Sequence, residues 1–161
     1  MEQLVQVWDT KSRPGGGRTF LDLPDLLPVL EPEARDWMWG IQRLPDVSLA
    51  EDSEFASLAD LESRIRAGPR GLLLDHEGLY HFDRQVVQVV RGEFLAAESP
   101  AALPRPDDPD EQVGEQALAG LFAFDSSYWF VGGPAAVIDR VAARFERVEH
   151  VDPRRWVRHE R

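Results

Sequence analysis

The stretch LFAFDSSYWFVGGPAAVIDRVAARF, Leu121 to Phe145, constrains the fold more than any other part of the sequence. Two short apolar segments, Leu121–Phe124 and Tyr128–Val131, are separated by Asp-Ser-Ser, which is typical of a turn between two strands. The Gly-Gly-Pro that follows introduces apolar residues at three- and four-residue spacing, and Pro134 suits the first turn of a helix. A strand, turn, strand and helix in one run predict an α+β fold with an antiparallel sheet.

The periodicity predicts two main helices, at about residues 53–67 and 134–147. In the first, Phe55, Leu58, Leu61 and Ile65 fall on one face, and Gly68 is suited to end the helix. A chain of 161 residues corresponds to about one domain, and no internal repeat is visible, so residues 1–161 are expected to form a single domain.

Short strands are predicted at Leu4–Trp8, Asp36–Leu44 and Val148–Val151. A single helical turn is expected around Pro28, because Pro28 and Pro32 work against a long helix. Residues 71–97 carry apolar runs interrupted at His76-Glu77-Gly78 and at Asp83-Arg84. This pattern predicts a meander of three or four antiparallel strands.

The charge balance restricts the class of partner. With 18 basic and 29 acidic residues, the formal net charge is −11, which repels nucleic acid and anionic membranes and attracts a basic partner. No apolar run approaches the roughly 18 residues of a membrane span, and the start lacks the pattern of a signal peptide. Together with the absence of cysteine, these features lead us to expect a cytoplasmic protein.

The segment at about 99–116 is rich in proline and acidic residues, and we expect an exposed loop there. Its acidic side chains are candidate contacts for a protein with a basic surface. An exposed tryptophan beside acidic groups would also suit an interface, and Trp8 is the candidate near the start. The predicted partner-binding residues are Asp107, Asp108, Asp110, Glu111, Glu115 and Trp8.

No complete catalytic motif is present, and we expect neither enzymatic activity nor a cofactor. Ser126 and Ser127 lack the Gly-x-Ser-x-Gly pattern of hydrolases and are better explained as turn residues. His76 and His81 are five residues apart, and solvated histidines of a hairpin explain them better than a metal site. The Pro-Gly-Gly-Gly-Arg stretch lacks the Lys-Ser/Thr of a phosphate-binding loop.

The order of three short motifs resembles that of small bacterial immunity proteins, which are encoded beside secreted toxins. The motifs are WMWGI, then AFDSSYW followed by a helix, and VEHVD; the specific part covers about Ala123–Asp152. The resemblance implies a cytoplasmic protein that neutralises a cognate toxin by direct binding. It implies no particular toxin and assigns no functional residue.

The hypothesis from the sequence is therefore an acidic protein-binding module, of which an immunity protein covering a basic toxin domain is the leading form. The first alternative is a small-ligand-binding protein or an enzyme whose aromatic pocket includes His76, His81 or nearby carboxylates. The second is a structural subunit that pairs with itself through an exposed edge strand, so a homo-oligomer stays open.

Overall fold

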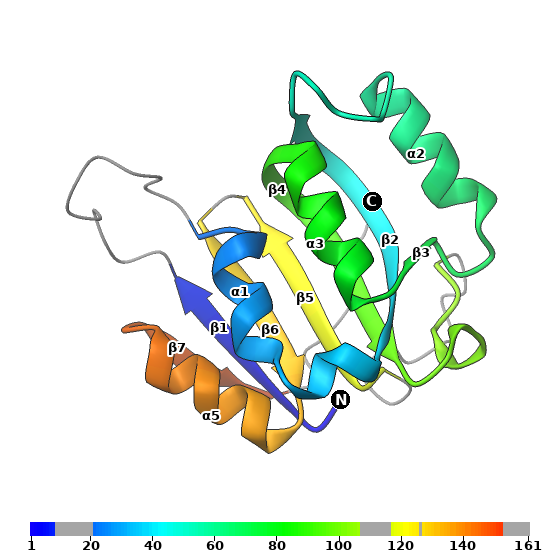
Figure 1. Ribbon diagram of the computed structural model, residues 1–161. Helices are drawn as coiled ribbons and strands as arrows, with labels where there is room; N and C mark the ends of the chain where they lie inside the picture. The colour runs from blue at the N-terminus through cyan, green and yellow to red at the C-terminus, as the bar shows by residue number, and fades with distance from the viewer. Residues whose placement is uncertain (9–20, 107–116, 126, 153–161) are drawn as a thin grey trace.

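The protein folds around one seven-stranded sheet (Figure 1). The computed structural model describes residues 1–8, 21–106, 117–125 and 127–152. In chain order the elements are β1 (Gln3–Trp8), α1 (Leu23–Leu30), the 3₁₀ helix η1 (Glu33–Asp36), β2 (Met38–Leu49), α2 (Leu58–Ala67), β3 (Leu72–Leu74), α3 (His76–Gln85), β4 (Val86–Ala97), the 3₁₀ helix η2 (Pro100–Ala102), β5 (Ala119–Phe124), β6 (Tyr128–Gly133), α5 (Ala135–Arg144) and β7 (Val148–Val151).

The strand order is β3-β2-β4-β5-β6-β1-β7, and every neighbouring pair is antiparallel. The predicted α+β class and antiparallel sheet are confirmed. The predicted hairpin of β5 and β6 and the closing strand β7 are also present. Four α-helices lie in the described residues, where the sequence predicted two main ones.

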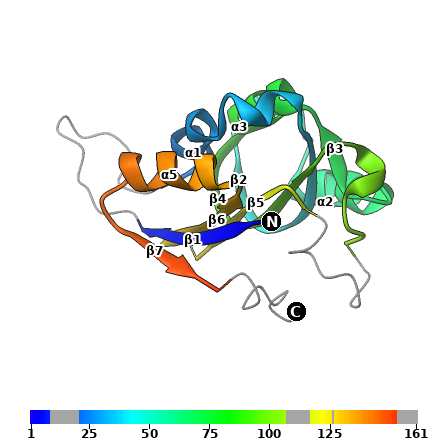
Figure 2. The same cartoon turned by 90° about the horizontal axis from the view of Figure 1, so that it is seen from below.

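One face of the sheet carries most of the core. Figure 2 shows α1, α3 and α5 on this face, while α2 packs against β2 and β3. Trp39, Phe94 and Trp129 are fully buried here, and the rings of Phe94 and Trp129 stack with centroids 6.2 Å apart. The indole Nε1 of Trp129 donates a hydrogen bond of 3.0 Å to the Leu21 carbonyl. This bond joins β6 to the residue that comes two positions before α1, so the buried Trp129 helps to hold α1 against the sheet.

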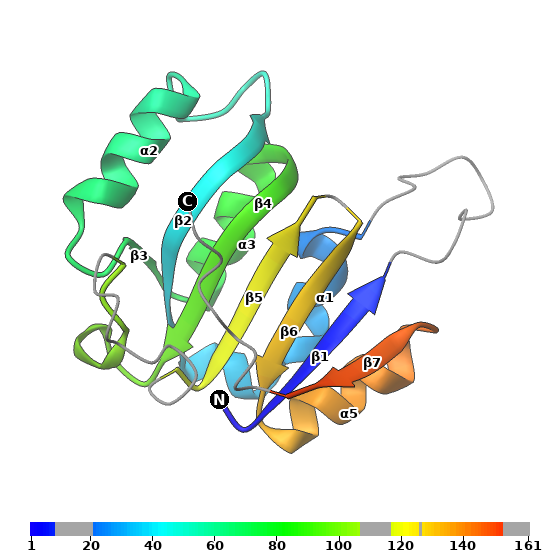
Figure 3. The same cartoon turned by 180° about the vertical axis from the view of Figure 1, so that it is seen from behind.

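The second face of the sheet is seen in Figure 3, where no helix of the described residues crosses β5, β6 or β1. A smaller buried cluster lies on it, made of Leu95, Ala97, Leu103, Ala117 and Phe122. Side-chain donors hold the segment after η2 against this face. Gln42 donates to the Pro104 carbonyl (2.5 Å), Arg43 to the Pro106 carbonyl (3.5 Å) and Arg70 to the Leu103 carbonyl.

The prediction of a strand meander over residues 71–97 is wrong in its middle third. Residues His76–Gln85 form α3, with strands only before and after it. Asp75 caps this helix, since its Oδ1 accepts the Gly78 N–H at 2.6 Å, and the buried residues His76, Leu79 and Phe82 follow a three-residue period. Gly78 indicated a turn but lies in the first turn of the helix. A Cβ there would come within 3.0 Å of the Asp75 carboxylate.

Helix boundaries also differ from those predicted. The helix α1 has two turns instead of one, and it contains the exposed Pro28. It begins with a capping box. The Asp22 carboxylate accepts a hydrogen bond from the Asp25 N–H, and the Asp25 carboxylate accepts one from the Asp22 N–H. The helix α2 starts only after Ser57, whose Oγ accepts the Asp60 N–H at 3.2 Å, and Ser53 lies in the preceding loop.

Candidate functional site

Of the predicted partner-binding residues, the structure describes Trp8 alone. Asp107, Asp108, Asp110, Glu111 and Glu115 lie outside the described residues, as do Ser126 and His159. The neighbouring described residues do fix where the acidic segment departs and returns. Pro106 is held by Arg43 on the second face, and Ala117 is buried in the small cluster on that face. Both ends of the segment therefore lie on the same side of the sheet.

Trp8 lies on this second face, within a row of side chains that crosses the strands at one end of the sheet. Trp8 is directly opposite Tyr128 in the β1–β6 register, and Tyr128 is directly opposite Phe124 in the β5–β6 register. Arg147 follows beside Trp8, because the Trp8 N–H donates to the Arg147 carbonyl at 3.2 Å. Arg91 ends the row on β4, next to the Gly92–Ala123 pair. We call these five residues the aromatic row.

The rings of the aromatic row contact one another in sequence. The centroid distance is 6.2 Å from Trp8 to Tyr128 and 5.2 Å from Tyr128 to Phe124, and the second pair is stacked with 22° between the planes. The guanidinium of Arg147 lies over the Trp8 ring, 4.3 Å from its centroid, and that of Arg91 lies 6.0 Å from the Phe124 centroid. Such cross-strand aromatic and cation–π contacts each stabilise the sheet by about 0.5–1 kcal/mol.

The three aromatic side chains are half-buried, while Arg91 and Arg147 are exposed. Burial raises the pKa of the Tyr128 phenol, and the nearby Asp125 carboxylate raises it further. The hydroxyl therefore keeps its proton well above neutral pH and is available as a donor at the rim of an apolar strip. The arrangement suits the binding of a flat or extended apolar group that carries polar ends.

A second row lies next to the aromatic row on the same face, one step along the strands. The register places Glu149 beside Gln6, Gln6 opposite Phe130, and Phe130 opposite Phe122. Glu93 follows opposite Phe122 and is almost fully buried. The aromatic row thus ends in arginines, whereas the second row has Glu149 at its β7 end and continues past Glu93 to Arg43 of β2.

The tip of the β5–β6 hairpin supports the structural interpretation of its polar residues. Asp125 has a left-handed backbone (φ 53°), which aspartate tolerates better than most residues. The Ser127 N–H donates to the Phe124 carbonyl at 3.3 Å, and the Ser127 hydroxyl donates to the Asp125 carbonyl at 3.0 Å. These are bonds of a tight turn.

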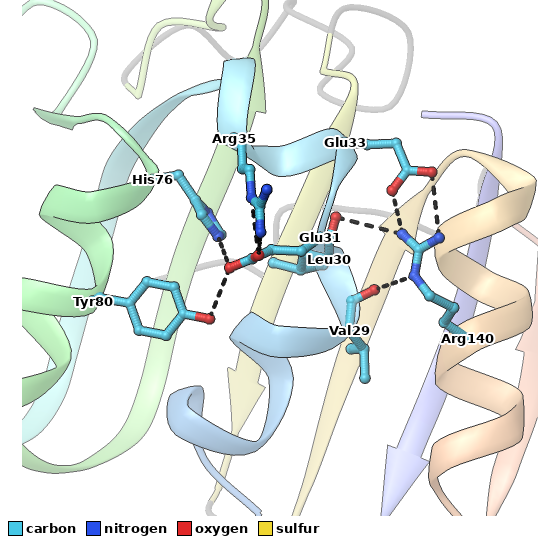
Figure 4. Close-up of polar contacts among 8 residues, drawn as sticks. All are labelled: Val29, Leu30, Glu31, Glu33, Arg35, His76, Tyr80 and Arg140. Carbon is cyan, nitrogen blue, oxygen red and sulfur yellow. Dashed lines mark hydrogen bonds and ion pairs between the residues drawn. The ribbon is translucent and has the colours of Figure 1, made fainter.

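A separate polar cluster joins α1 to α3 on the helical face (Figure 4). Glu31, which follows the last residue of α1, accepts from Arg35 at 2.6 Å and from the Tyr80 hydroxyl at 3.2 Å, and its Oε1 lies 3.3 Å from His76 Nε2. The hydrogen bond from Arg35 is the main reason that the pKa of Glu31 is lowered, and His76 and Tyr80 add to it. Burial and the Glu31 charge raise the pKa of Tyr80.

Arg140 of α5 fastens the other side of α1 (Figure 4). Its guanidinium donates to the Val29 carbonyl at 2.9 Å and to the Leu30 carbonyl at 3.5 Å, and it also forms an ion pair with Glu33. The hydrogen bond from Arg140 lowers the pKa of Glu33. Since the last carbonyls of a helix have no partner within it, Arg140 satisfies the end of α1 while holding α5 beside it.

The histidines do not meet as a hairpin would have placed them. His76 is buried, with its Nδ1 unpartnered in the described part of the chain, whereas His81 is exposed and lies 3.6 Å from Glu54. His150 is exposed on β7. Within the described ranges, no group of three or more His, Cys, Asp or Glu residues has the geometry to hold a metal ion.

The sequence identified Trp8 but missed Phe124, Tyr128, Arg91 and Arg147 as its companions. Phe124 and Tyr128 flank a predicted turn, so their pairing across the hairpin could have been inferred. The positions of Trp8 and the two arginines depend on the strand order, which the sequence does not reveal.

No protein-family model, curated protein or solved structure matches this chain. Among the helices that the structure describes, none is long and apolar enough to cross a membrane.

Proposed function

We propose that this protein works by binding a protein partner through the second face of its sheet, with the aromatic row at the centre of the interface. The composition of the row is the observation that carries the proposal. Trp, Tyr and Arg are the residue types that contribute most binding free energy at protein interfaces. Here a tryptophan, a tyrosine and two arginines lie side by side on a face that no described helix covers.

The leading form of this proposal is an immunity protein that neutralises a toxin in the cytoplasm by covering its surface. The net charge of −11 would accelerate encounter with a basic toxin domain. The acidic segment leaves and rejoins the fold on the same face as the aromatic row, which allows one partner to meet both. Long-range charge would then bring the partner in, and the aromatic row would hold it.

The small-ligand alternative has less support. The unpartnered Nδ1 of the buried His76 is the one observation in its favour. Against it, the Glu31 carboxylate beside His76 is already bound by side chains of its own chain, and His81 lies apart on the exposed side of α3. A structural connection between helices explains this cluster better than a ligand site.

The test is affinity capture with the tagged full chain, followed by an assay of what is captured. We expect the wild-type chain to retain a protein that inhibits growth or a cellular process, and to suppress that activity when it is added in stoichiometric amount. The Trp8→Ala chain should lose at least tenfold in affinity. Leu73→Ala, which removes an exposed apolar side chain from the edge strand β3, is the matched control.

Thermal melting of both variants separates lost contact from lost folding. If the captured protein has no activity that this chain suppresses, the immunity form of the proposal is wrong. If Trp8→Ala and Leu73→Ala bind as the wild type does, the interface is not on the aromatic row.

A further inference from the structure

We propose that the aromatic row binds an extended segment of the partner whose two ends carry carboxylates and whose centre is apolar. This inference rests on the proposed function and specifies the chemistry that its central contact would recognise. The observation behind it is the charge of the row: a positive side chain lies at each end, and three rings lie between them.

The two arginines differ from four others in the structure. Arg35, Arg64, Arg66 and Arg140 each form an ion pair with a carboxylate of this chain. In the part of the chain that the structure describes, Arg91 and Arg147 form none, and each is exposed with its guanidinium against a ring. An exposed guanidinium that lies over an aromatic ring still has N–H donors available for a carboxylate.

The spacing of the row limits the length of the segment. Trp8 lies on β1 and Phe124 on β5, with β6 between these two strands, so the three rings span about 10 Å. The two arginines lie up to one strand further out on each side. An extended chain advances about 3.3 Å per residue. Carboxylates about four to six positions apart would therefore reach both guanidinium groups, with apolar or proline residues over the rings between them.

The neighbouring row fixes where the segment binds. A segment shifted by one step along the strands would place one of its carboxylates near the exposed Glu149, which ends the second row on β7. Repulsion between like charges opposes that position. The two rows thus select one placement of an acidic segment and reject the adjacent one.

Rings on a sheet with arginines beside them could also stack on the bases of a single-stranded nucleic acid. The whole-molecule charge of −11 decides against this occupant. A nucleic acid carries a phosphate at every residue and would be repelled along its length, whereas a segment of an otherwise basic protein needs only two carboxylates.

The test is selection from a phage-displayed library of random twelve-residue peptides on the full chain, with counter-selection on Trp8→Ala. We expect enriched peptides to carry two acidic residues four to six positions apart, with an apolar or proline centre. On the variant with both Arg91→Glu and Arg147→Glu, the enriched peptides should carry Lys or Arg at those two positions instead. Arg64→Glu with Arg66→Glu, on α2, is the control and should select the same peptides as the wild type.

Three outcomes would overturn the inference. These are enrichment of basic peptides on the wild-type chain, enrichment of the same peptides on the Trp8→Ala chain as on the wild type, and no enrichment of any peptide at all. Tighter binding of a six-residue oligothymidylate than of the selected peptides would overturn it in favour of single-stranded nucleic acid. The arginine exchange keeps the test valid if Trp8→Ala fails to fold. If the captured partner binds the double arginine variant as tightly as the wild type, the inference about an acidic segment is wrong, while the proposed binding function still stands.

Discussion

The two tryptophans of the β1–β6 pair have opposite roles although they are close in the sheet. Trp8 is half-buried on the second face, and Trp129, opposite Val7, is fully buried on the helical face. Side chains of neighbouring residues in a strand point to opposite faces, so one step along β1, from Val7 to Trp8, leads from the core to the second face.

Trp129→Phe tests the core role. The change removes part of a fully buried side chain and leaves the Leu21 carbonyl without its donor. We expect the free energy of unfolding to fall by about 2–3 kcal/mol, measured by urea denaturation. Trp8→Phe, as the control, should cost less than about 1 kcal/mol, because its side chain is partly exposed. Equal losses for the two variants would contradict this division of roles.

Glu31 makes stability depend on pH in the acidic range. Its pKa in the folded protein is lowered from the ordinary value of 4.5, chiefly by the hydrogen bond from Arg35. The folded state therefore binds a proton less readily than the unfolded state, so the stabilisation is present above pH 4.5 and is lost as the pH falls through the lowered pKa.

We expect Glu31→Gln to lower the melting temperature at pH 7 and to have a smaller effect as the pH falls below 4.5, when melting is followed from pH 7 to pH 3. Glu62→Gln, which removes an exposed ion pair with Arg66 on α2, is the control and should change the melting temperature little at either pH. A loss at pH 3 as large as that at pH 7 would show that the carboxylate charge does not stabilise the junction.

At the scale of elements, α3 is the instructive case. Its sequence combines a glycine, two histidines and apolar residues, and the same letters fit a broken strand or a short helix. Tertiary packing decided between them, because Leu79 and Phe82 are buried against the sheet and the rings of Phe82 and Phe94 lie 6.1 Å apart. The signal that could have favoured the helix was Asp75, a good capping residue directly before it.

Asp75→Ala should therefore destabilise the protein by about 1 kcal/mol, because the Gly78 N–H loses its acceptor at the start of α3. Asp75→Asn keeps an acceptor and should cost less. Chemical denaturation of the three proteins measures the difference, and a fully stable Asp75→Ala variant would mean that packing alone holds α3.

The sequence predicted elements where their period was regular and failed where it was mixed. The β5–β6 hairpin, the helix after Pro134 and the strand β7 follow directly from local patterns. The aromatic row does not, because it joins residues from the beginning, middle and end of the chain. Only the strand order brings Trp8, Arg91 and Tyr128 together, and strand order depends on contacts between distant segments that no local pattern encodes.

At the scale of the whole molecule, charge and shape divide the work of binding in the function we propose. The acidic excess acts over a distance of about one Debye length, roughly 8–10 Å at physiological salt, and the aromatic row acts only in contact. Changes in the acidic segment should therefore alter the association rate, and changes in the row should alter the dissociation rate.

Neutralising four acidic residues of the segment tests the first half of this statement. The variant is Asp107→Asn, Asp108→Asn, Asp110→Asn and Glu111→Gln. We expect the association rate with the captured partner to fall about three- to tenfold at low ionic strength, with a weaker salt dependence and a similar dissociation rate. Stopped-flow or surface-based kinetics at two salt concentrations measures both rates.

The control carries the same change of net charge outside the acidic segment, at exposed positions of the β2–α2 connection and of α3. It consists of Glu51→Gln, Asp52→Asn, Glu54→Gln and Glu77→Gln. If both variants slow association equally, total charge steers the partner and the segment has no special part. If neither slows it, electrostatic steering is absent.

The position of β1 has a consequence for how the protein reaches its folded state. Among the strands that the structure describes, the first, β1, lies between the last two, β6 and β7, and pairs with no other. During synthesis, β1 must wait until residues 128–133 have been made before its first neighbour exists, and pairings over such separations make folding slow. The tryptophan at the end of β1 acquires its surroundings last, so the surface that would meet a partner is completed only when the sheet itself is closed at that edge.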